Sequence, residues 1–437
     1  MSTVPDAAGV SEHAELEERT YRKVTRRLVP FLFLCYLAAY LDRVNVGFAK
    51  LRMLDDLGFS NTVYGFGAGI FFLGYVLFEV PSNIILHRVG ARVWIARIMI
   101  TWGLVAGAMV FVRTPMQFYI VRFLLGVAEA GFIPGVLLYL TYWFPAARRG
   151  RIVALFLAAI PMSSIIGGPL SGWILRAFSD IGGLSGWQWL FLLETIPSLA
   201  LGVATLFYLD DRVSAAHWLD TEEKRIVSAG VAAEAKGKEA HSSFADAFRS
   251  GRVWVLGLAY FCFANGIYVI SFWLPTLIKQ KGVSDLVEIG FLTAVPYTVA
   301  IVAMIYVNVR ADRTGERRWH TVVPCLLAGA GLMASAVQTD NLVLAMLALT
   351  LATAGTTTTL AAFWSLPSAF LGGAAAATGI ALVNSLGNIA GFVSTSLVGW
   401  MTDLTGSTQS TLYFFGALMF VGGALVLTIP ARLVNRR

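Results

Sequence analysis

Ionisable side chains occur inside long apolar stretches of this sequence, where a charge is costly and is seldom kept without a function. They are Asp42, Arg43, Glu79, Arg97, Arg122, Glu129 and Glu194. A carboxyl group can take up and release a proton, and a guanidinium can bind a carboxylate through two parallel hydrogen bonds. These residue types predict proton transfer and anion binding within an apolar medium.

The first charged pair divides between two faces if its segment is helical. Tyr36, Tyr40 and Arg43 recur at i, i+4 and i+7 and share a face. Asp42 is rotated by about 100° from Arg43 and must address a different neighbour. We expect Arg43 to face a cavity and to bind an anion there.

Arg122 and Glu129 lie two helical turns apart on nearly the same face. We expect the first and fourth apolar segments to be adjacent, with Arg122 between Asp42 and Glu129. A low dielectric disfavours the charged carboxylate, and a nearby guanidinium favours it. Asp42 and Glu129 are therefore predicted to carry protons, with Arg122 as the charge that tunes them.

Structural roles are the alternatives. The Asp42–Arg43 pair could fix the first segment, and Arg122 with Glu129 could form a lock. The other intramembrane charges are interpreted as structural because they lie beside prolines or near segment ends, where long side chains reach the interface. These are Glu79, Arg97 and Glu194.

The composition explains why these charges lie in apolar surroundings. Of 437 residues, 57% are hydrophobic and 14% charged, with a mean hydropathy of +0.70, whereas soluble domains carry roughly 25% charged residues. Apolar runs of this length predict membrane-spanning helices. We expect twelve, at about 28–48, 62–84, 93–112, 116–143, 152–175, 187–209, 254–278, 288–309, 320–337, 341–364, 375–402 and 409–431.

The longest hydrophilic gap divides six predicted spans from six. The expected organisation is an N-terminal segment (1–27), a six-helix bundle (28–209), a linker with a helix near Thr221 (210–252), a second six-helix bundle (253–431) and a C-terminal segment (432–437). Lys and Arg gather in both terminal segments, the linker and the loops on the same side. The positive-inside rule therefore makes both termini cytoplasmic.

The net charge of +7 is attributed to these loops and not to nucleic-acid binding. The three cysteines, Cys35, Cys262 and Cys325, fall in apolar segments and are interpreted as core residues. We expect a multi-pass protein of the bacterial inner membrane that functions as a monomer.

An internal repeat supports two related halves. Asn83-Ile-Ile-Leu-His-Arg88-Val-Gly90-Ala-Arg92 follows the second span, and Asn308-Val-Arg-Ala-Asp312-Arg313-Thr-Gly315-Glu-Arg317 follows the eighth. These loops resemble the cytoplasmic signature of the major facilitator superfamily. His87 departs from the acid usual at its position, and Asn83 departs from the usual glycine. The resemblance implies two pseudo-symmetric six-helix bundles. It also implies cytoplasmic gating loops that latch the outward-open state, with Arg88, Arg92, Asp312, Arg313 and Arg317.

Three further stretches narrow the resemblance to one branch. They are Tyr40-x-Asp42-Arg43-x-Asn45, Glu129-Ala-Gly131-Phe-x-Pro134-Gly135 and Tyr139-Leu-x-Tyr142-Trp143-Phe144-Pro145. These are similar to the anion:cation symporters, which include phthalate, tartrate, sugar-acid and hydroxyphenylacetate permeases. The resemblance implies proton coupling at Asp42 and Glu129 and carboxylate binding at Arg43.

Further cavity contacts complete the predicted site. The resemblance adds Tyr40, Tyr75 and Asn384. The C-terminal half is expected to recognise the neutral part of the substrate through Asn265, Tyr268, Trp364, Ser365, Asn384 and Asn388. Each of these polar groups could instead be satisfied by a neighbouring helix. Ile160-Pro-Met-Ser163-Ser164 lacks the amide that sugar-acid carriers often present, which favours a less polar or aromatic carboxylate.

Two other functions are weighed. Gly168-Pro169-x-x-Gly172 partly resembles the antiporter motif of the same superfamily, so an anion exchanger or drug exporter is the alternative. A membrane enzyme is disfavoured because the histidines and cysteines lack metal-ligand spacing and no nucleophile or phosphate-binding motif occurs. The sequence therefore predicts a secondary transporter that imports a small organic carboxylate by proton symport with alternating access, without a cofactor.

Overall fold

The protein is almost entirely helical. The computed structural model describes residues 7–235, 250–337, 341–367 and 373–435. Among these residues, twelve helical segments are long and apolar enough to cross a membrane, which confirms the predicted fold class. Parts of the predicted N-terminal segment, linker and C-terminal segment, namely 1–6, 236–249 and 436–437, lie outside the described residues.

Most spans are single helices. In chain order the described α-helices are α1 (Ala7–Leu57), α2 (Asn61–Val89), α3 (Ala91–Gly107), α4 (Pro115–Glu129), α5 (Phe132–Thr141), α6 (Ala146–Leu157), α7 (Ala159–Ala177), α8 (Gly186–Tyr208), α9 (Thr221–Ala235), α11 (Gly251–Lys279), α12 (Leu286–Thr314), α13 (Arg318–Ala336), α14 (Leu342–Phe363), α16 (Gly373–Thr405), α17 (Gln409–Leu427) and α18 (Ala431–Val434). Two 3₁₀ turns, η1 (Ala108–Phe111) and η2 (Val213–Ala215), extend α3 and follow α8.

Local sequence fixes the helix ends. Ser60 and Asp285 cap α2 and α12 by accepting hydrogen bonds from first-turn N–H groups. Thr114 caps α4 in a capping box with Gln117, and Pro115 occupies the first helical position. The predicted linker helix is present as α9, which Lys23 of α1 contacts through Glu223 at 2.6 Å.

The fourth span, predicted at 116–143, is present at Pro115–Thr141 but is broken into two helices. α4 ends at Glu129 and α5 begins at Phe132, because Gly131 adopts a left-handed conformation with φ of +87°. A Cβ there would lie 2.3 Å from the hydroxyl of Ser82, so α2 also requires the glycine. The break places Glu129 at the carboxyl end of a half-helix inside the bundle.

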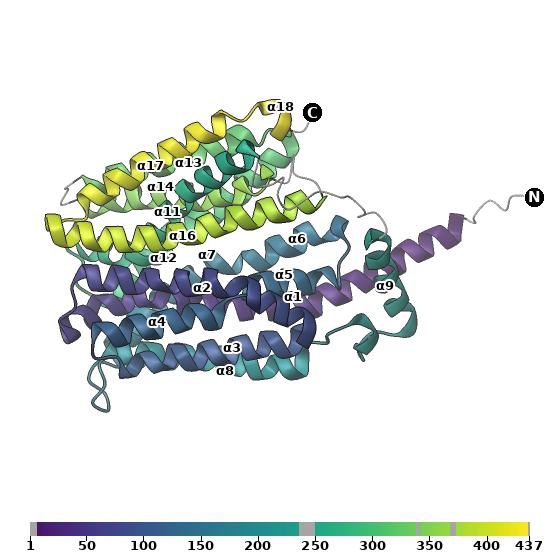
Figure 1. The fold of residues 1–437 in the computed structure, drawn as a ribbon, viewed down its shortest axis with the longest axis horizontal. Coiled ribbons are helices and arrows are strands. Elements are labelled where there is room, and N and C mark those ends of the chain that lie inside the picture. Colours follow the sequence, from purple (N-terminus) through teal and green to yellow (C-terminus); the bar gives the residue numbers. More distant parts are fainter. Residues whose placement is uncertain (1–6, 236–249, 338–340, 368–372, 436–437) are drawn as a thin grey trace, which may run out of the picture.

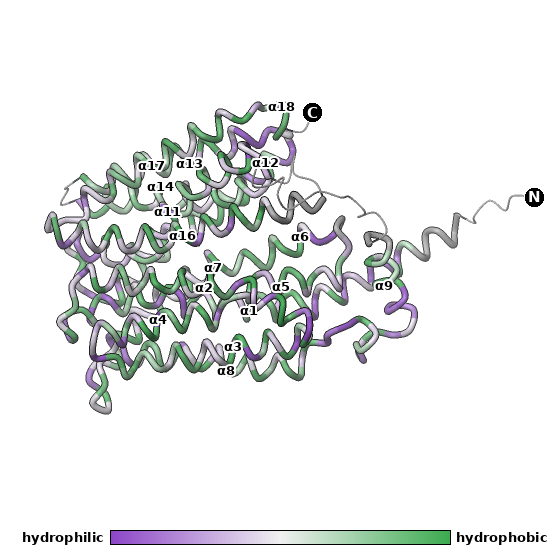
Figure 2. Tube along the Cα trace, in the orientation of Figure 1, coloured by the Kyte–Doolittle hydropathy of each residue, from purple (hydrophilic) through white to green (hydrophobic). Residues whose placement is uncertain are grey.

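The twelve spans form two six-helix bundles. Figure 1 shows them one above the other, α1 to α8 below and α11 to α17 above, with both chain termini at the same end. We call this the terminal end and the opposite one the far end. α1 contacts α11, α2 contacts α16 and α7 contacts α12 across the interface. Figure 2 shows hydrophobic residues along the spans and hydrophilic residues concentrated near the helix ends and the linker.

Glycines bring the bundles into backbone contact toward the far end. A Cβ on Gly399 of α16 would lie 2.2 Å from the carbonyl oxygen of Asn61, and one on Gly168 of α7 would lie 2.6 Å from that of Gly290. Small residues permit such close helix packing inside a membrane. The Gly168-Pro169 stretch that partly resembles an antiporter motif thus packs α7 against α12.

Polar contacts reinforce the same end. Asp403 accepts hydrogen bonds from the backbone N–H groups of Asn61 and Thr62, at 3.1 and 2.7 Å. Lys50 of α1 is buried, with its ammonium 3.4 Å from the centre of the Trp273 ring of α11. The two bundles are therefore closed on each other at the far end.

The glycine contacts make a stability prediction. Gly399→Ala should overpack the α2–α16 interface and reduce the free energy of unfolding by about 1–3 kcal/mol, because the nearest atoms are backbone. Thermal unfolding of the purified protein measures this change. Gly150→Ala in α6 is the control, since that position is exposed with open space around it. Equal unfolding temperatures for the two variants would contradict the tight contact.

Candidate functional site

The central contact of the site is a buried ion pair between α1 and α4. Nη2 of Arg43 donates to Oε1 of Glu129, and the two side chains are only 6% and 3% exposed. The first and fourth spans therefore meet, as the sequence predicted. Arg43 was expected to face a cavity and to bind an anion, and in the structure its anionic partner is Glu129 at the end of the α4 half-helix.

Aromatic rings surround the Arg43 guanidinium. Its central carbon lies 5.6 Å from the ring centre of Tyr40, 5.5 Å from that of Tyr75 and 5.2 Å from that of Phe71. Ring faces attract a cation, more strongly when water is excluded. Tyr40 and Tyr75 were predicted site residues, whereas sequence reasoning missed Phe71. Its position one helical turn before Tyr75 on α2 was the available signal.

Arg122 occupies a different place from the one predicted. It is fully buried and donates from Nε and Nη2 to the backbone carbonyls of Gly67 and Ala68 in α2, each at 3.4 Å. Its Nη1 has no hydrogen-bond partner. The expectation that Arg122 lies between Asp42 and Glu129 was wrong, because α2 packs close enough for the guanidinium to reach its backbone.

The position of Arg122 sets the charge of the site. Its guanidinium carbon is 5.1 Å from the centre of the Phe71 ring, whose neighbourhood also includes Arg43. The Arg43–Glu129 pair is neutral as a unit, so Arg122 adds a positive charge beside it. A group of two guanidinium ions and one carboxylate favours the approach of an anion.

Asp42 faces away from this cluster. Its Oδ2 accepts hydrogen bonds from Nε1 of Trp102 in α3, at 2.9 Å, and from the hydroxyl of Ser198 in α8. The prediction that Asp42 and Arg43 address different neighbours is confirmed. α1 therefore separates two acidic groups: Glu129 lies with Arg43 on one side, and Asp42 lies between α3 and α8 on the other.

Glu79 joins the two bundles. Nδ2 of Asn384 in α16 donates to its Oε1 at 3.2 Å, and Glu79 lies one helical turn after Tyr75 on α2. The structure thus places the predicted contact Asn384 near the N-terminal cluster. Sequence reasoning interpreted Glu79 as structural, although its spacing from Tyr75 indicated a shared face.

The other predicted contacts of the C-terminal bundle are dispersed. Asn265 is buried and donates to Phe261 of its own helix at 2.7 Å, and Asn388 is also buried. Trp364 packs against Tyr260, with ring centres 4.9 Å apart. The carbonyl of Ser365 accepts from Nη1 of Arg317 at 3.1 Å. The structure therefore places Ser365 at the terminal end and not beside Arg43.

The two signature loops bind the last segment of their own bundles. The Arg92 backbone and guanidinium contact Asp211, which follows α8, at 2.8 and 3.8 Å. The repeat-equivalent Arg317 donates its backbone N–H to Asn435, which follows α17, at 2.9 Å. Arg88, Asp312 and Arg313 are exposed.

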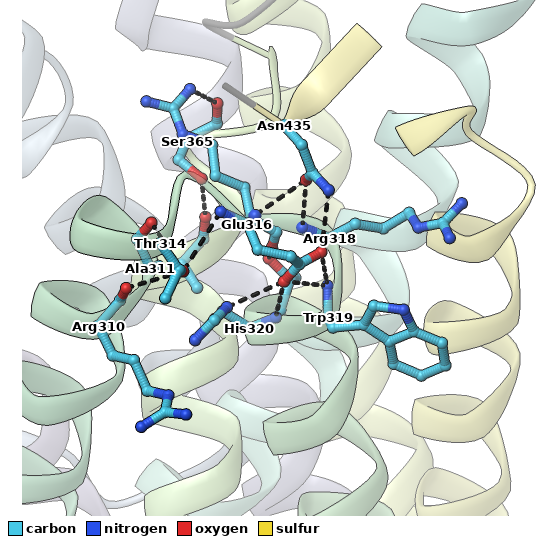
Figure 3. A network of polar contacts seen from close by, with 12 residues as sticks. Arg310, Ala311, Thr314, Glu316, Arg318, Trp319, His320, Ser365 and Asn435 are labelled. Atoms are coloured by element: carbon cyan, nitrogen blue, oxygen red, sulfur yellow. Dashed lines mark hydrogen bonds and ion pairs between the residues drawn. The ribbon is translucent and has the colours of Figure 1, made fainter. Parts of the chain in front are cut away.

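Figure 3 shows the Asn435 network in the second signature loop. Glu316 caps α13 by accepting from the N–H groups of Trp319 and His320, and Asn435 donates to it at 3.2 Å. Burial raises the pKa of the Glu316 carboxyl, but these hydrogen bonds outweigh burial and leave that pKa below its ordinary value. The network fixes the α12–α13 loop to the chain after α17.

Comparison with known proteins identifies the family. The model of the Major Facilitator Superfamily matches residues 32–395. The chain belongs to this superfamily. It is accordingly a multi-pass membrane transporter and not an enzyme, and the superfamily resemblance of the signature loops is confirmed.

Relatives within the superfamily carry several names. The chain is 50% identical to the putative metabolite transport protein NicT of Pseudomonas putida, over 99% of this chain and 100% of the relative. It is 51% identical to a putative tartrate transporter of Agrobacterium vitis, over 95% and 92%. It is 39% identical to a quinolone resistance transporter of Acinetobacter baumannii, over 97% and 98%. The tartrate transporter supports the predicted organic-anion branch.

Solved structures agree on the fold. The inward-open xylose transporter XylE of Escherichia coli superposes with a TM-score of 0.74 at 15% identity, covering 93% of this chain and 96% of that one. This similarity supports the two-bundle architecture.

The ion pair at the centre of this transporter makes a testable prediction. Glu129→Gln should lower the free energy of unfolding by about 3–5 kcal/mol, because it leaves the Arg43 charge buried without a counter-charge. The double variant Arg43→Gln/Glu129→Gln should recover much of that loss. Thermal unfolding of the single and double variants measures it. A double variant less stable than both single variants would contradict the pairing.

Proposed function

We propose that this transporter imports a small organic carboxylate together with protons by alternating access. The observation that carries the proposal is the buried Arg43–Glu129 pair inside the ring of Tyr40, Phe71 and Tyr75. A guanidinium that already pairs with a carboxylate in this protein has the geometry to pair with the carboxylate of a substrate.

Protonation of Glu129 couples the two ligands. A neutral Glu129 no longer compensates Arg43, and a buried guanidinium without a counter-charge is costly. A substrate carboxylate then replaces Glu129 as the partner of Arg43. Conversely, release of the substrate favours the charged form of Glu129, which restores the pair. Substrate and proton therefore bind together, and the loss of both returns the site to the state in the structure.

Other residues contribute to the substrate site. Arg122 contributes a second positive charge, which makes the electrostatic potential at the site more positive and so favours an anion. Tyr40 and Tyr75 border the Arg43 guanidinium, and Asn384 contacts Glu79, one helical turn after Tyr75. The neutral part of the substrate is assigned to the C-terminal bundle, with Asn265, Asn388, Trp364 and Ser365 as candidates that a change of conformation would bring into contact.

The charge of the loops orients the protein. Lys and Arg residues gather at the terminal end, which the positive-inside rule assigns to the cytoplasm, here that of a bacterium with the protein in its inner membrane. The far end, where the bundles are closed on each other, is then the side away from the cytoplasm. In the outward-facing state the signature loops would latch the cytoplasmic side through Arg88, Arg92, Asp312, Arg313 and Arg317.

Exchange or drug export is the second candidate. The 39% identical relative named for quinolone resistance favours it. The glycines at 168 and 172 that suggested an antiporter have another use here, since both pack α7 against α12. Stimulation of uptake by an inward proton gradient supports symport, whereas stimulation by an internal counter-anion supports exchange.

Arg43→Lys tests the anion contact. The variant keeps the charge but loses the forked geometry, so substrate affinity should fall by about tenfold or more, the ratio for about 1.4 kcal/mol. A thermal-shift screen of purified wild type against carboxylates first finds a ligand, which raises the unfolding temperature. The same titration is then repeated with the variant. Arg97→Lys is the matched control, because Arg97 packs against Trp94, at 4.4 Å, away from the site. Unchanged affinity in Arg43→Lys would remove Arg43 from the substrate site.

Glu129→Gln tests the coupling. The amide mimics the protonated acid permanently, so accumulation driven by a proton gradient in proteoliposomes should be lost while substrate exchange between the two sides persists. Uptake of labelled substrate with and without the gradient separates the two modes. Accumulation at the wild-type level would exclude Glu129 as a coupling residue.

A further inference from the structure

Two buried acids lie on the opposite side of α1 from the Arg43–Glu129 ion pair. Asp42 of α1 and Glu194 of α8 are 2% and 4% exposed. Oδ1 of Asp42 and Oε2 of Glu194 have no hydrogen-bond partner. Glu194 was interpreted from the sequence as a residue that pins its helix, and it takes no part in the coupling between Arg43 and Glu129.

Neighbouring contacts bring the two carboxyl groups together. Ser198, one turn after Glu194 on α8, donates to Asp42. Asn45, one turn after Asp42 on α1, faces Glu194, and the two acids lie within electrostatic reach of each other. Ser171 of α7 donates to Oε1 of Glu194 at 2.9 Å. Each helix therefore presents an acid to a neutral polar side chain of the other: Asp42 of α1 meets Ser198 of α8, and Glu194 of α8 meets Asn45 of α1.

Cations are absent from this group among the residues that the structure describes. Neither acid forms a salt bridge there, since Arg43 is turned to Glu129 and Arg122 to the backbone of α2. The donors around the pair are neutral: Trp102 from α3, Ser171 from α7 and Ser198 from α8. Besides Glu194 of α8, the charged group from another element that acts on Asp42 is Glu129 of α4, which has the same sign.

Two adjacent negative charges cannot be sustained in such a place. Burying one carboxylate without a counter-charge is already costly, and a second one nearby adds repulsion. One proton held by the two carboxyl groups removes the repulsion, and the single negative charge that remains is stabilised by the neutral donors Trp102, Ser171 and Ser198. Asp42 is already a predicted coupling residue, and we propose that Glu194 joins it in a pair that holds one shared proton and acts as the second coupling site of the transporter, apart from Glu129.

This inference deepens the proposed proton symport and rests on it for its role in transport. Glu129 would take up its proton when the substrate binds Arg43 and lose it when the substrate leaves, whereas the Asp42–Glu194 pair would not touch the substrate. α1 carries residues of both sites, so a movement of α1 that opens the Arg43 site also changes the surroundings of the pair.

A small cavity offers the pair a route to water. It lies between the bundles, and Asn45, Ser171, Ser164, Ser271, Thr293 and Tyr297 are among its lining residues. It has room for about one water molecule. Asn45 and Ser171 are the two neighbours of Glu194 named above. Because Ser271, Thr293 and Tyr297 belong to the C-terminal bundle, rocking of the bundles would widen or close this route.

Infrared difference spectroscopy of the full-length protein in lipid tests the shared proton directly. Wild type in unbuffered neutral medium should show the carbonyl band of a buried protonated carboxyl group, and Glu194→Gln should remove or shift it. Glu288→Gln is the control, because Glu288 is exposed in the first turn of α12. Ser171→Ala keeps every acid and removes one donor to Glu194, so it should shift the frequency of the band even if Glu194→Gln does not fold. An identical band in wild type, Glu194→Gln and Ser171→Ala would overturn the proposal.

Transport gives a separate readout. In proteoliposomes Glu194→Gln should reduce proton-driven accumulation at least tenfold while leaving the affinity for substrate unchanged, and Glu194→Asp should restore part of it. Wild type that lacks proton-driven uptake but shows the Glu194-dependent band would refute the proposed symport and leave the proton-binding pair standing. Accumulation driven by a sodium gradient and abolished in Glu194→Gln would assign the pair to sodium and overturn the shared proton.

Discussion

The cost of a charge in an apolar medium organises this transporter. Each ionised side chain inside the bundle must find a partner, and the partners found here differ in kind. Arg43 has Glu129 and aromatic rings, Arg122 has backbone carbonyls and a ring, and Asp42 has neutral hydrogen-bond donors. Of these three arrangements, only the Arg43–Glu129 pair can be opened by a proton that neutralises Glu129 and closed again by a substrate anion that binds Arg43. The coupling proposed here follows from this change of partner.

Helix packing makes these arrangements possible. Gly67 and Gly126 allow α2 and α4 to approach so closely that a Cβ on either would meet an atom of the other helix. The guanidinium of Arg122 therefore reaches the α2 backbone. The break at Gly131 ends α4 at Glu129 and directs the acid toward α1. Broken helices often mark binding sites in transporters, because a half-helix end supplies polar groups at membrane depth.

The two faces of α1 belong to two different groups of buried charges. One face presents Arg43, packed against Tyr40, to α2 and α4, and the other presents Asp42 to α3 and α8. α1 also crosses to the C-terminal bundle, where Lys50 lies over Trp273. A single rigid helix thus contacts the anion site, the acid pair and the partner bundle. Movement of one bundle against the other would act on both acidic sites through this helix.

The sequence by itself determined the membrane spans, the two-bundle fold, the residues with intramembrane charge and the division of Asp42 and Arg43 between two faces. The spans and the division of Asp42 from Arg43 follow from helix length and helical rotation, which are local properties, whereas the two-bundle fold followed from the internal repeat and the family resemblance of the signature loops. Only the tertiary structure decided that Arg43 and not Arg122 pairs with Glu129. It also decided that Phe71 lies with the tyrosines around Arg43 and that Glu194 faces Asp42. Partner choice among several buried charges depends on how closely α2, α4 and α8 approach α1. That approach is set by glycines and by the helix break at Gly131. The sequence shows where these residues lie along the chain but not which neighbouring helix they contact.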